Sequence, residues 1–211
     1  MIDWVVLDVG ETLIDETRVW ATWARELGIS PLTFGAALGA AIARGFDHQT
    51  AFDLLGFPDW RRLEDRVQAE FGGFRPEDLY DDALRTERAL HERGRNVAIL
   101  ANQPASRSAQ LLGLGFRPDV IAMSGELGVS KPDPAFFARG LELMGNPDPM
   151  TVVYVGDRID RDVHPCHACG FRAVWLRRGP WGRLQEDLDH DADLTVWSLD
   201  EMVERLPELD G

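Results

Sequence analysis

The sequence contains very little lysine and cysteine, and it has no long apolar run near its N-terminus. Of its 22 basic residues, Lys131 is the one lysine and the rest are arginine. Cys166 and Cys169 are too few for the disulfide framework of a small secreted protein. The apolar run at residues 4–7 is far shorter than a signal-peptide core or a membrane-spanning helix requires. These absences predict a cytoplasmic protein without a membrane partner.

Basic residues are also outnumbered. Asp and Glu total 36 against 22 Lys and Arg, which gives a formal net charge of -14. Nucleic acids and anionic membranes carry dense negative charge themselves, so neither is expected as a partner. A small anionic substrate stays compatible with this charge if local cations or a metal ion reverse the field. The 211 residues, 45% of them hydrophobic, suffice for one globular core with a modest accessory domain, and we expect a monomer or a homodimer.

The apolar pattern changes once along the chain. After an expected strand at residues 3–7, apolar residues recur at helical spacing over residues 16–78. From residue 79 onward, helices alternate with short apolar strands, expected at 97–100, 120–122, 152–155, 173–176 and 194–197. This alternation predicts an α/β fold with a doubly wound, Rossmann-like parallel sheet. We assign 1–15 and 79–211 to that core and 16–78 to an all-helical insertion.

Polar side chains stand where several of these strands end. In a doubly wound sheet, ligands bind beyond the carboxyl ends of the strands. Asp8, Asn102 and Asp157 each follow an expected strand. Asp157 and Asp162 flank a strand-to-helix turn, so both can face a hard cation such as Mg²⁺, which takes oxygen ligands. Asp160, between them, is expected only to favour the positive N-terminal end of the next helix.

Lys131 lies in a stiff segment. Pro132 and Pro134 follow it closely, just before an expected helix, and they restrict the backbone in a way that suits an aimed side chain. An ammonium group is a compact point charge that can neutralise an aspartate and a phosphoryl oxygen together. The alternative is an ordinary solvated lysine at the surface.

The order of these features resembles the four motifs of the haloacid dehalogenase-like hydrolase superfamily, and the resemblance extends over the whole chain. The helical insertion at 16–78 lies where that family places a cap domain, between its first and second motifs. The matching positions are Asp8 with Thr12, then Asn102, then Lys131 in Lys-Pro-Asp-Pro, then Gly156-Asp157 with Asp162.

The resemblance implies a role for each of these residues. Asp8 corresponds to the nucleophile and Lys131 to the lysine that neutralises charge. Thr12 and Asn102 correspond to substrate-binding positions. The implied cofactor is Mg²⁺, with ligands from Asp8, the backbone carbonyl of Gly10, Asp157 and Asp162.

Two positions depart from the pattern of the family's phosphatases. Gly10 stands where they carry a second aspartate as general acid and base, and Ala101 where a serine or threonine binds the phosphoryl group. Loss of general acid–base help typically costs about 10²- to 10⁴-fold in rate. Glu11 is a candidate replacement, although adjacent residues leaving a strand tend to point to opposite sides. We therefore expect a Mg²⁺-dependent phosphatase of a small phosphorylated metabolite, working through an aspartyl-phosphate on Asp8, with impaired or atypical catalysis.

Two alternatives stay open at this point. One is a catalytically impaired binding or regulatory protein on the same fold. The other is a haloacid dehalogenase, because nucleophilic attack on carbon needs no acid for the leaving group. The phosphonatase-like branch requires a cap lysine, and residues 16–78 contain none. Within that segment, Arg18, Arg44 and His48 are candidates for selecting an anionic substrate.

Overall fold

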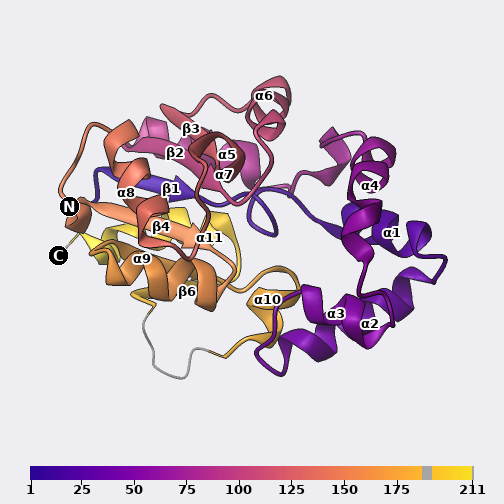
Figure 1. The fold of residues 1–211 in the computed structure, drawn as a ribbon. Helices are drawn as coiled ribbons and strands as arrows, with labels where there is room; N and C mark the ends of the chain where they lie inside the picture. The colour runs from indigo at the N-terminus through magenta and orange to yellow at the C-terminus, as the bar shows by residue number, and fades with distance from the viewer. Residues whose placement is uncertain (187–191, 211) are drawn as a thin grey trace.

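The computed structural model describes residues 1–186 and 192–210 (Figure 1). Within these residues, six parallel strands form one sheet in the order β3-β2-β1-β4-β5-β6. This is the doubly wound, Rossmann-like order, and it confirms the predicted fold class. The strands are β1 (Trp4–Leu7), β2 (Asn96–Ala101), β3 (Val120–Met123), β4 (Val152–Gly156), β5 (Arg172–Leu176) and β6 (Leu194–Val196).

Helices cover both faces of the sheet, because successive side chains of each strand point to opposite faces. Val5 and Leu7 pack into the cluster on one face, and Val6 into the cluster on the other. The first face is covered by α5 (Ala83–Glu92), α6 (Ser106–Gly113) and α11 (Leu199–Arg205). The second face is covered by α8 (Pro134–Leu143) and α9 (His164–Ala168). The short α7 (Ser124–Leu127) follows β3.

The start of α8 follows from its sequence. The side chain of Asp133 accepts a hydrogen bond from the backbone N–H of Ala135 at 2.9 Å, and Pro134 occupies the first turn. An N-cap acid followed by proline is a favourable helix start, since proline lacks the N–H that this position leaves unsatisfied. The helix therefore begins directly after the segment that carries Lys131.

A separate group of helices lies between β1 and α5, to the right of the sheet in Figure 1. Their aromatic side chains form the centre of an apolar cluster, in which the ring centroids of Phe52 and Trp60 lie 4.5 Å apart and those of Trp23 and Phe52 5.0 Å apart. The predicted helical character of residues 16–78 is confirmed, and their status as a domain of their own stays a prediction. The helices are α1 (Thr17–Glu26), α2 (Pro31–Ile42), α3 (Gln49–Leu54) and α4 (Glu64–Phe71).

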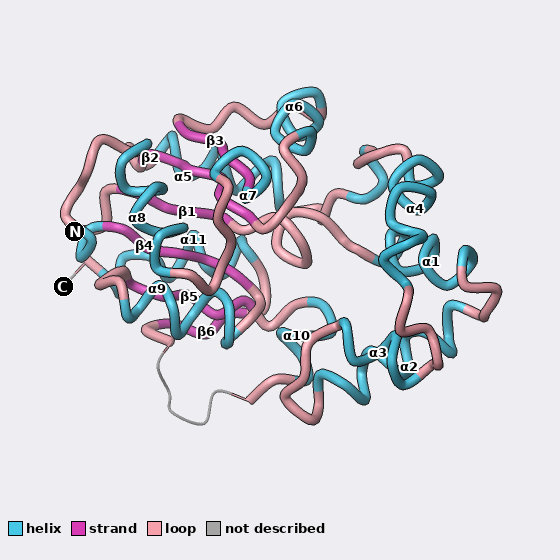
Figure 2. The backbone as a smooth tube through the Cα atoms, in the orientation of Figure 1, coloured by secondary structure: helices cyan, strands magenta, loops and turns pink. Residues whose placement is uncertain are grey.

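One helix that the sequence analysis did not predict joins this cluster from the C-terminal part of the chain. In α10 (Gly179–Leu184), Trp181 is buried, and its ring centroid lies 6.2 Å from that of Trp20 in α1. Figure 2 shows α10 on the side of the helical segment, near α2. Among the described residues, no helix is both long and apolar enough to cross a membrane.

Candidate active site

The predicted acids meet at the carboxyl edge of the sheet. Asp8 follows β1 and Asp157 follows β4, and these two strands are neighbours although they are far apart in the sequence. Strand order reverses at this point, which is where doubly wound sheets bind ligands. A cavity of about 180 Å³ lies there, below the ~300 Å³ at which pockets for drug-sized ligands begin. Residues of both parts of the chain line it, among them Asp8, Asn102, Lys131, Asp157, Trp20 and His48.

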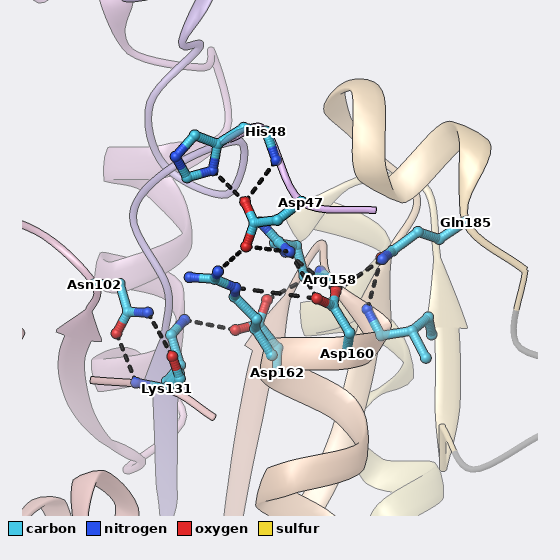
Figure 3. A network of polar contacts seen from close by, with 10 residues as sticks. Asp47, His48, Asn102, Lys131, Arg158, Asp160, Asp162 and Gln185 are labelled. Atoms are coloured by element: carbon cyan, nitrogen blue, oxygen red, sulfur yellow. Dashed lines mark hydrogen bonds and ion pairs between the residues drawn. The ribbon is translucent and has the colours of Figure 1, made fainter. Parts of the chain in front are cut away.

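Lys131 is buried between two carboxylates. Its Nζ lies 2.8 Å from Oδ1 of Asp8 and donates a hydrogen bond of 2.5 Å to Oδ1 of Asp162 (Figure 3 shows the contact with Asp162). Burial alone would lower the pKa of Lys131, but the negative charges of Asp162 and Asp8 outweigh it and raise the pKa above its ordinary value. The ammonium group therefore keeps its charge and is aimed at Asp8.

Asn102 holds the backbone of Lys131 with both ends of its amide. Its Nδ2 donates to the Lys131 carbonyl oxygen at 2.9 Å, and its Oδ1 accepts from the Lys131 N–H at 2.8 Å (Figure 3). This pair of bonds links the end of β2 to the lysine segment. Asn102 also lines the cavity, and its contact with a substrate stays a prediction.

Asp157 and Asp162 are both buried but differ in their hydrogen bonds. Asp162 accepts from Lys131 through Oδ1 and from the N–H of Arg158 through Oδ2, at 3.0 Å. Its carboxyl packs so tightly against Gly156 that a Cβ at that position would overlap it, so a glycine is required there. For Asp157, by contrast, Oδ2 is buried and has no hydrogen-bond partner among the described residues. Of these two acids, Asp157 is therefore the one with a buried carboxylate oxygen that no described residue engages.

The cluster of acids fits a hard divalent cation. Carboxylate oxygens of Asp8, Asp157 and Asp162 all lie within 4.8 Å of one another. Oxygens around an octahedral Mg²⁺ ion are about 3 to 4 Å apart, since each lies about 2.1 Å from the metal. Burial raises the pKa of Asp8 to about 6, against the effect of Lys131, and burial with the nearby acids raises the pKa of Asp157 well above its usual range. A bound cation relieves this repulsion, so these residues suit the Mg²⁺ that the sequence predicts.

Gly10 lines the cavity, and the carboxyl group of Glu16 fills the space beside it. A Cβ built on Gly10 would lie 2.5 Å from Oε1 of Glu16 and 2.9 Å from its Cδ. Gln103 Nε2 donates to the same oxygen at a longer distance of 3.4 Å. Burial raises the pKa of Glu16 to about 8, and the charges of Glu11 and Asp8 add to the effect. The sequence analysis missed Glu16, because an acid just before a helix is ordinarily explained by the helix dipole.

Glu11 is engaged elsewhere by both of its oxygens. Its Oε2 accepts a hydrogen bond of 2.5 Å from the hydroxyl of Tyr80, and its Oε1 accepts from the Glu16 N–H at 3.2 Å. Burial raises the pKa of Glu11 to about 7, although the Tyr80 bond opposes the rise. Glu11 thus supports the turn that carries Glu16.

Thr12 lies apart from the other predicted site residues. It is fully buried and is not among the residues that line the cavity. Its hydroxyl has no hydrogen-bond partner within the described part of the chain, whereas its carbonyl oxygen accepts from Nη1 of Arg178 at 2.9 Å. Thr12 is thus not among the predicted residues that the structure brings to the cavity, and its contact with a substrate stays a prediction.

Two arginines add positive charge to the cavity, and a carboxylate of the helical segment bridges them. Arg158 and Arg161 follow β4 and line the cavity. Asp47, in the loop before α3, forms ion pairs with Arg161 and with Arg158, the latter at 3.7 Å, and it also contacts His48 (Figure 3). Asp160 binds the guanidinium of Arg158 with both carboxylate oxygens, at 2.6 and 3.1 Å. These contacts join the helical segment to the sheet-containing part.

The three residues of the helical segment that were predicted to select an anionic substrate have different surroundings. His48 lines the cavity, but Arg44 is exposed to solvent. Arg18 donates to both oxygens of Asp78 and to the carbonyl of Phe71, so it connects the beginning and the end of the helical segment. Of the three, His48 alone is positioned to contact a substrate.

Comparison with known proteins agrees with this geometry. A model of the haloacid dehalogenase-like hydrolase family matches residues 2–170. The chain is 25% identical to a glyceraldehyde 3-phosphate phosphatase of Methanocaldococcus jannaschii, with 99% of each chain covered. It is 31% identical to a phosphoserine phosphatase of Thermus thermophilus, over 85% of this chain and 76% of that protein. The HAD-hydrolase YfnB of Bacillus subtilis, solved with magnesium bound, superimposes with a TM-score of 0.74 at 16% identity, over 97% of this chain and 98% of that one, a likeness of fold alone.

Proposed function

The chain belongs to the haloacid dehalogenase-like hydrolase family, and on this basis we propose that it is a Mg²⁺-dependent phosphatase of a small phosphorylated metabolite. One observation carries the proposal: a buried ammonium group lies 2.8 Å from the carboxylate that ends β1, inside a small cavity. A carboxylate nucleophile and a fixed cation beside it are suited to transfer of a phosphoryl group to an aspartate of the enzyme. The two curated relatives described above are named as phosphatases, which supports the same reaction.

In the proposed mechanism, an oxygen of Asp8 attacks phosphorus in line with the leaving oxygen and forms an acyl phosphate. Lys131 neutralises charge on Asp8 and on the phosphoryl oxygens as the transfer proceeds. Asp8, Asp157 and Asp162 would hold the metal with the carbonyl of Gly10, and bound Mg²⁺ supplies positive charge that stabilises the phosphoryl group. Water then attacks phosphorus, which releases inorganic phosphate and regenerates Asp8. We expect Asp157 to be the strongest metal ligand, because Lys131 and the backbone already engage Asp162.

The proposal includes a cap domain at 16–78 over a core domain of 1–15 and 79–211. Trp20 and His48 of this segment line the cavity together with Asp8, and Asp47 forms ion pairs with the core. A cover of this kind excludes water from the reaction, and its residues select the substrate. The nearby arginines favour an anionic small molecule as partner. A cytoplasmic location and a monomeric or dimeric state stay predictions from composition.

The test is turnover of acetyl phosphate and p-nitrophenyl phosphate with and without Mg²⁺. We expect Mg²⁺-dependent hydrolysis that Asp8→Asn abolishes. Asp3→Asn is the matched control, since it makes the same substitution at the exposed residue just before the same strand and should leave turnover unchanged. Folding of each variant is checked by its thermal transition.

Two results would contradict the proposal. Hydrolysis that persists in Asp8→Asn would exclude this carboxylate as the nucleophile. Absence of hydrolysis in the folded, Mg²⁺-supplemented wild type would favour a binding protein or a haloacid dehalogenase, and release of chloride from a 2-haloacid would distinguish these two alternatives.

A further inference from the structure

The carboxyl group of Glu16 occupies the volume into which a side chain at position 10 would extend. The distance of 2.5 Å between its Oε1 and a Cβ built on Gly10 is shorter than Cβ atoms essentially ever show, so a side chain at position 10 would displace this carboxyl group. Both residues line the cavity that contains Asp8. A carboxyl group therefore lies where the side chain of position 10, two residues after Asp8, would extend. It belongs to Glu16, which is farther along the chain.

Several contacts fix this position. The Glu16 N–H donates to Oε1 of Glu11, whose other oxygen is bonded to Tyr80. Gln103 Nε2 approaches Oε1 of Glu16 from the end of β2. Among the described residues, this is the one side-chain donor to the Glu16 carboxyl, and it is a long contact. The backbone of Glu16 is thus anchored by Glu11, and most of the hydrogen-bonding capacity of its carboxyl is available to a ligand in the cavity.

We propose that Glu16 is the general acid and base of the phosphatase reaction, in the place that a side chain at position 10 would otherwise take. This inference rests on the proposed function. In the first step, Asp8 forms its bond to phosphorus, the bond from phosphorus to the leaving oxygen breaks, and Glu16 gives its proton to that oxygen. In the second step, Glu16 takes a proton from the attacking water, whose oxygen bonds to phosphorus as the bond to Asp8 breaks. Glu16 ends protonated, as it began.

Glu11 and Gln103 are positioning residues in this scheme, because they act on Glu16 rather than on the substrate. Both oxygens of Glu11 already accept hydrogen bonds, so its carboxyl is less available to a leaving group than that of Glu16. This arrangement replaces Glu11 as the candidate that adjacency to Gly10 suggested. Because Glu16 supplies the acid–base group in this scheme, the loss in rate expected from glycine at position 10 is smaller.

The test compares Glu16→Gln with wild type on two substrates that differ in leaving group. Phenyl phosphate needs a proton on its leaving oxygen, whereas p-nitrophenyl phosphate releases a stable anion. For phenyl phosphate, kcat/KM should fall about 10²- to 10⁴-fold. For p-nitrophenyl phosphate, kcat/KM should stay within a few-fold of wild type while kcat falls, because water attack on the phosphorylated enzyme has lost its base.

A slow second step has a direct signature. Glu16→Gln should release a burst of about one p-nitrophenolate per enzyme, and the phosphorylated protein should accumulate and be detectable by mass spectrometry. Glu92→Gln is the matched control, since this glutamate is exposed on α5 and outside the cavity lining, and it should behave as wild type. A merely structural role of Glu16 would lower kcat/KM equally for both substrates and give no burst, and either finding would overturn the assignment.

A relocation experiment tests the shared space independently. Gly10→Asp alone places two carboxyl groups in one volume and should not increase turnover of phenyl phosphate. Glu16→Ala empties that volume. The double variant, Gly10→Asp with Glu16→Ala, should therefore have a kcat/KM at least about 10-fold higher than that of Glu16→Ala alone. No recovery in a folded double variant would refute the idea of a shared position. Inactivity of the wild type on every phosphate ester would instead refute the proposed function and this inference with it.

Discussion

Asp157 and Asp162 are both buried close to Asp8, yet replacing each by asparagine should shift the stability of the metal-free protein in opposite directions. Asp157 has an oxygen without a hydrogen-bond partner among the described residues and is repelled by the charges of Asp162 and Asp8. Asp157→Asn replaces this ionisable group with a neutral amide of the same size, and so removes the free-energy cost of burying or protonating it. Asp162 accepts from Nζ of Lys131 and from the Arg158 N–H, so Asp162→Asn removes half of the lysine's compensating charge.

The expected magnitudes follow from these contacts. Breaking a buried ion pair costs about 3 kcal/mol at the low end, which suits a lysine that still contacts Asp8. For a chain of about 200 residues, 1 kcal/mol corresponds to roughly 2 to 4 °C in Tm, so Asp162→Asn should melt about 6 to 12 °C below wild type. Asp157→Asn should melt about 2 to 4 °C above it, given about 1 kcal/mol for relieving an unpaired buried carboxylate.

Mg²⁺ should raise the Tm of wild type by more than it raises the Tm of Asp157→Asn. At a concentration about 100-fold above Kd, a ligand adds about 2.7 kcal/mol, or roughly 5 to 11 °C in Tm for wild type. If Asp157→Asn weakens binding about 100-fold, the same concentration adds about 0.4 kcal/mol and moves Tm by about 1 to 2 °C.

The assay is thermal unfolding with EDTA and across a Mg²⁺ titration, with Asp3→Asn as the surface control. The reasoning fails if Asp157→Asn keeps the full Mg²⁺ shift, because its free oxygen would then not be a ligand. It fails equally if metal-free Asp157→Asn melts below wild type, because the unpaired carboxylate would then not be destabilising.

Three further predictions concern the surroundings of Asp8. Lys131→Met should abolish turnover and lower stability by about 3 to 5 kcal/mol, because two buried carboxylates lose their cation; thermal melts and phosphate release measure both effects, and retained turnover would exclude Lys131 from the mechanism. Trp181→Ala should cost about 3 to 5 kcal/mol and raise KM, since this ring is buried in the helical cluster and lines the cavity; denaturant unfolding and steady-state kinetics test it, and an unchanged KM would argue against a cap contact. Asp47→Asn should raise KM while changing Tm little, because it releases a partly exposed contact between the two parts of the chain. An unchanged KM in the variant would show that this contact does not hold the cavity closed.

Much of the core was predictable because its periodicity is strong. Apart from Asn96, the strands at 4–7, 96–101 and 152–156 are continuous runs of apolar residues and glycine. Helices cover both faces of these strands, which is the pattern of a buried parallel sheet. Once the strands were predicted, the acids at their carboxyl ends followed from the rule for ligand sites in such sheets, and Asp8, Asp157 and Asp162 do lie together. The helix at 179–184 escaped prediction, because it is short and begins with Gly179-Pro180, which resembles a turn.

Glu16 could not be found by the same reasoning, since no sequence period brings it back to Gly10. The chain reverses within a few residues: Glu11 adopts a positive φ of 52°, its N–H donates to the Ile14 carbonyl at 2.8 Å, and Gly10 pairs with Ile14 in an isolated bridge. Such a conformation at a residue other than glycine is uncommon and is not encoded in propensity. Its position next to Gly10 in the sequence made Glu11 the candidate, whereas the turn places the carboxyl of Glu16 beside Gly10.

This turn also divides the proposed chemistry between the two parts of the fold. Asp8, the proposed nucleophile, and the ammonium group of Lys131 are held by elements of the sheet, through β1 and the bonds from Asn102 to the backbone of Lys131. Glu16 is instead the residue that precedes α1, the first helix of the cap segment. A change in the orientation of α1 therefore moves the proposed proton donor relative to phosphorus while the charge-stabilising groups stay fixed. In the proposed mechanism, closure of the helical segment would be coupled to protonation of the leaving group through this one backbone junction. We therefore expect a substrate that does not bring about closure to bind beside Asp8 without efficient turnover.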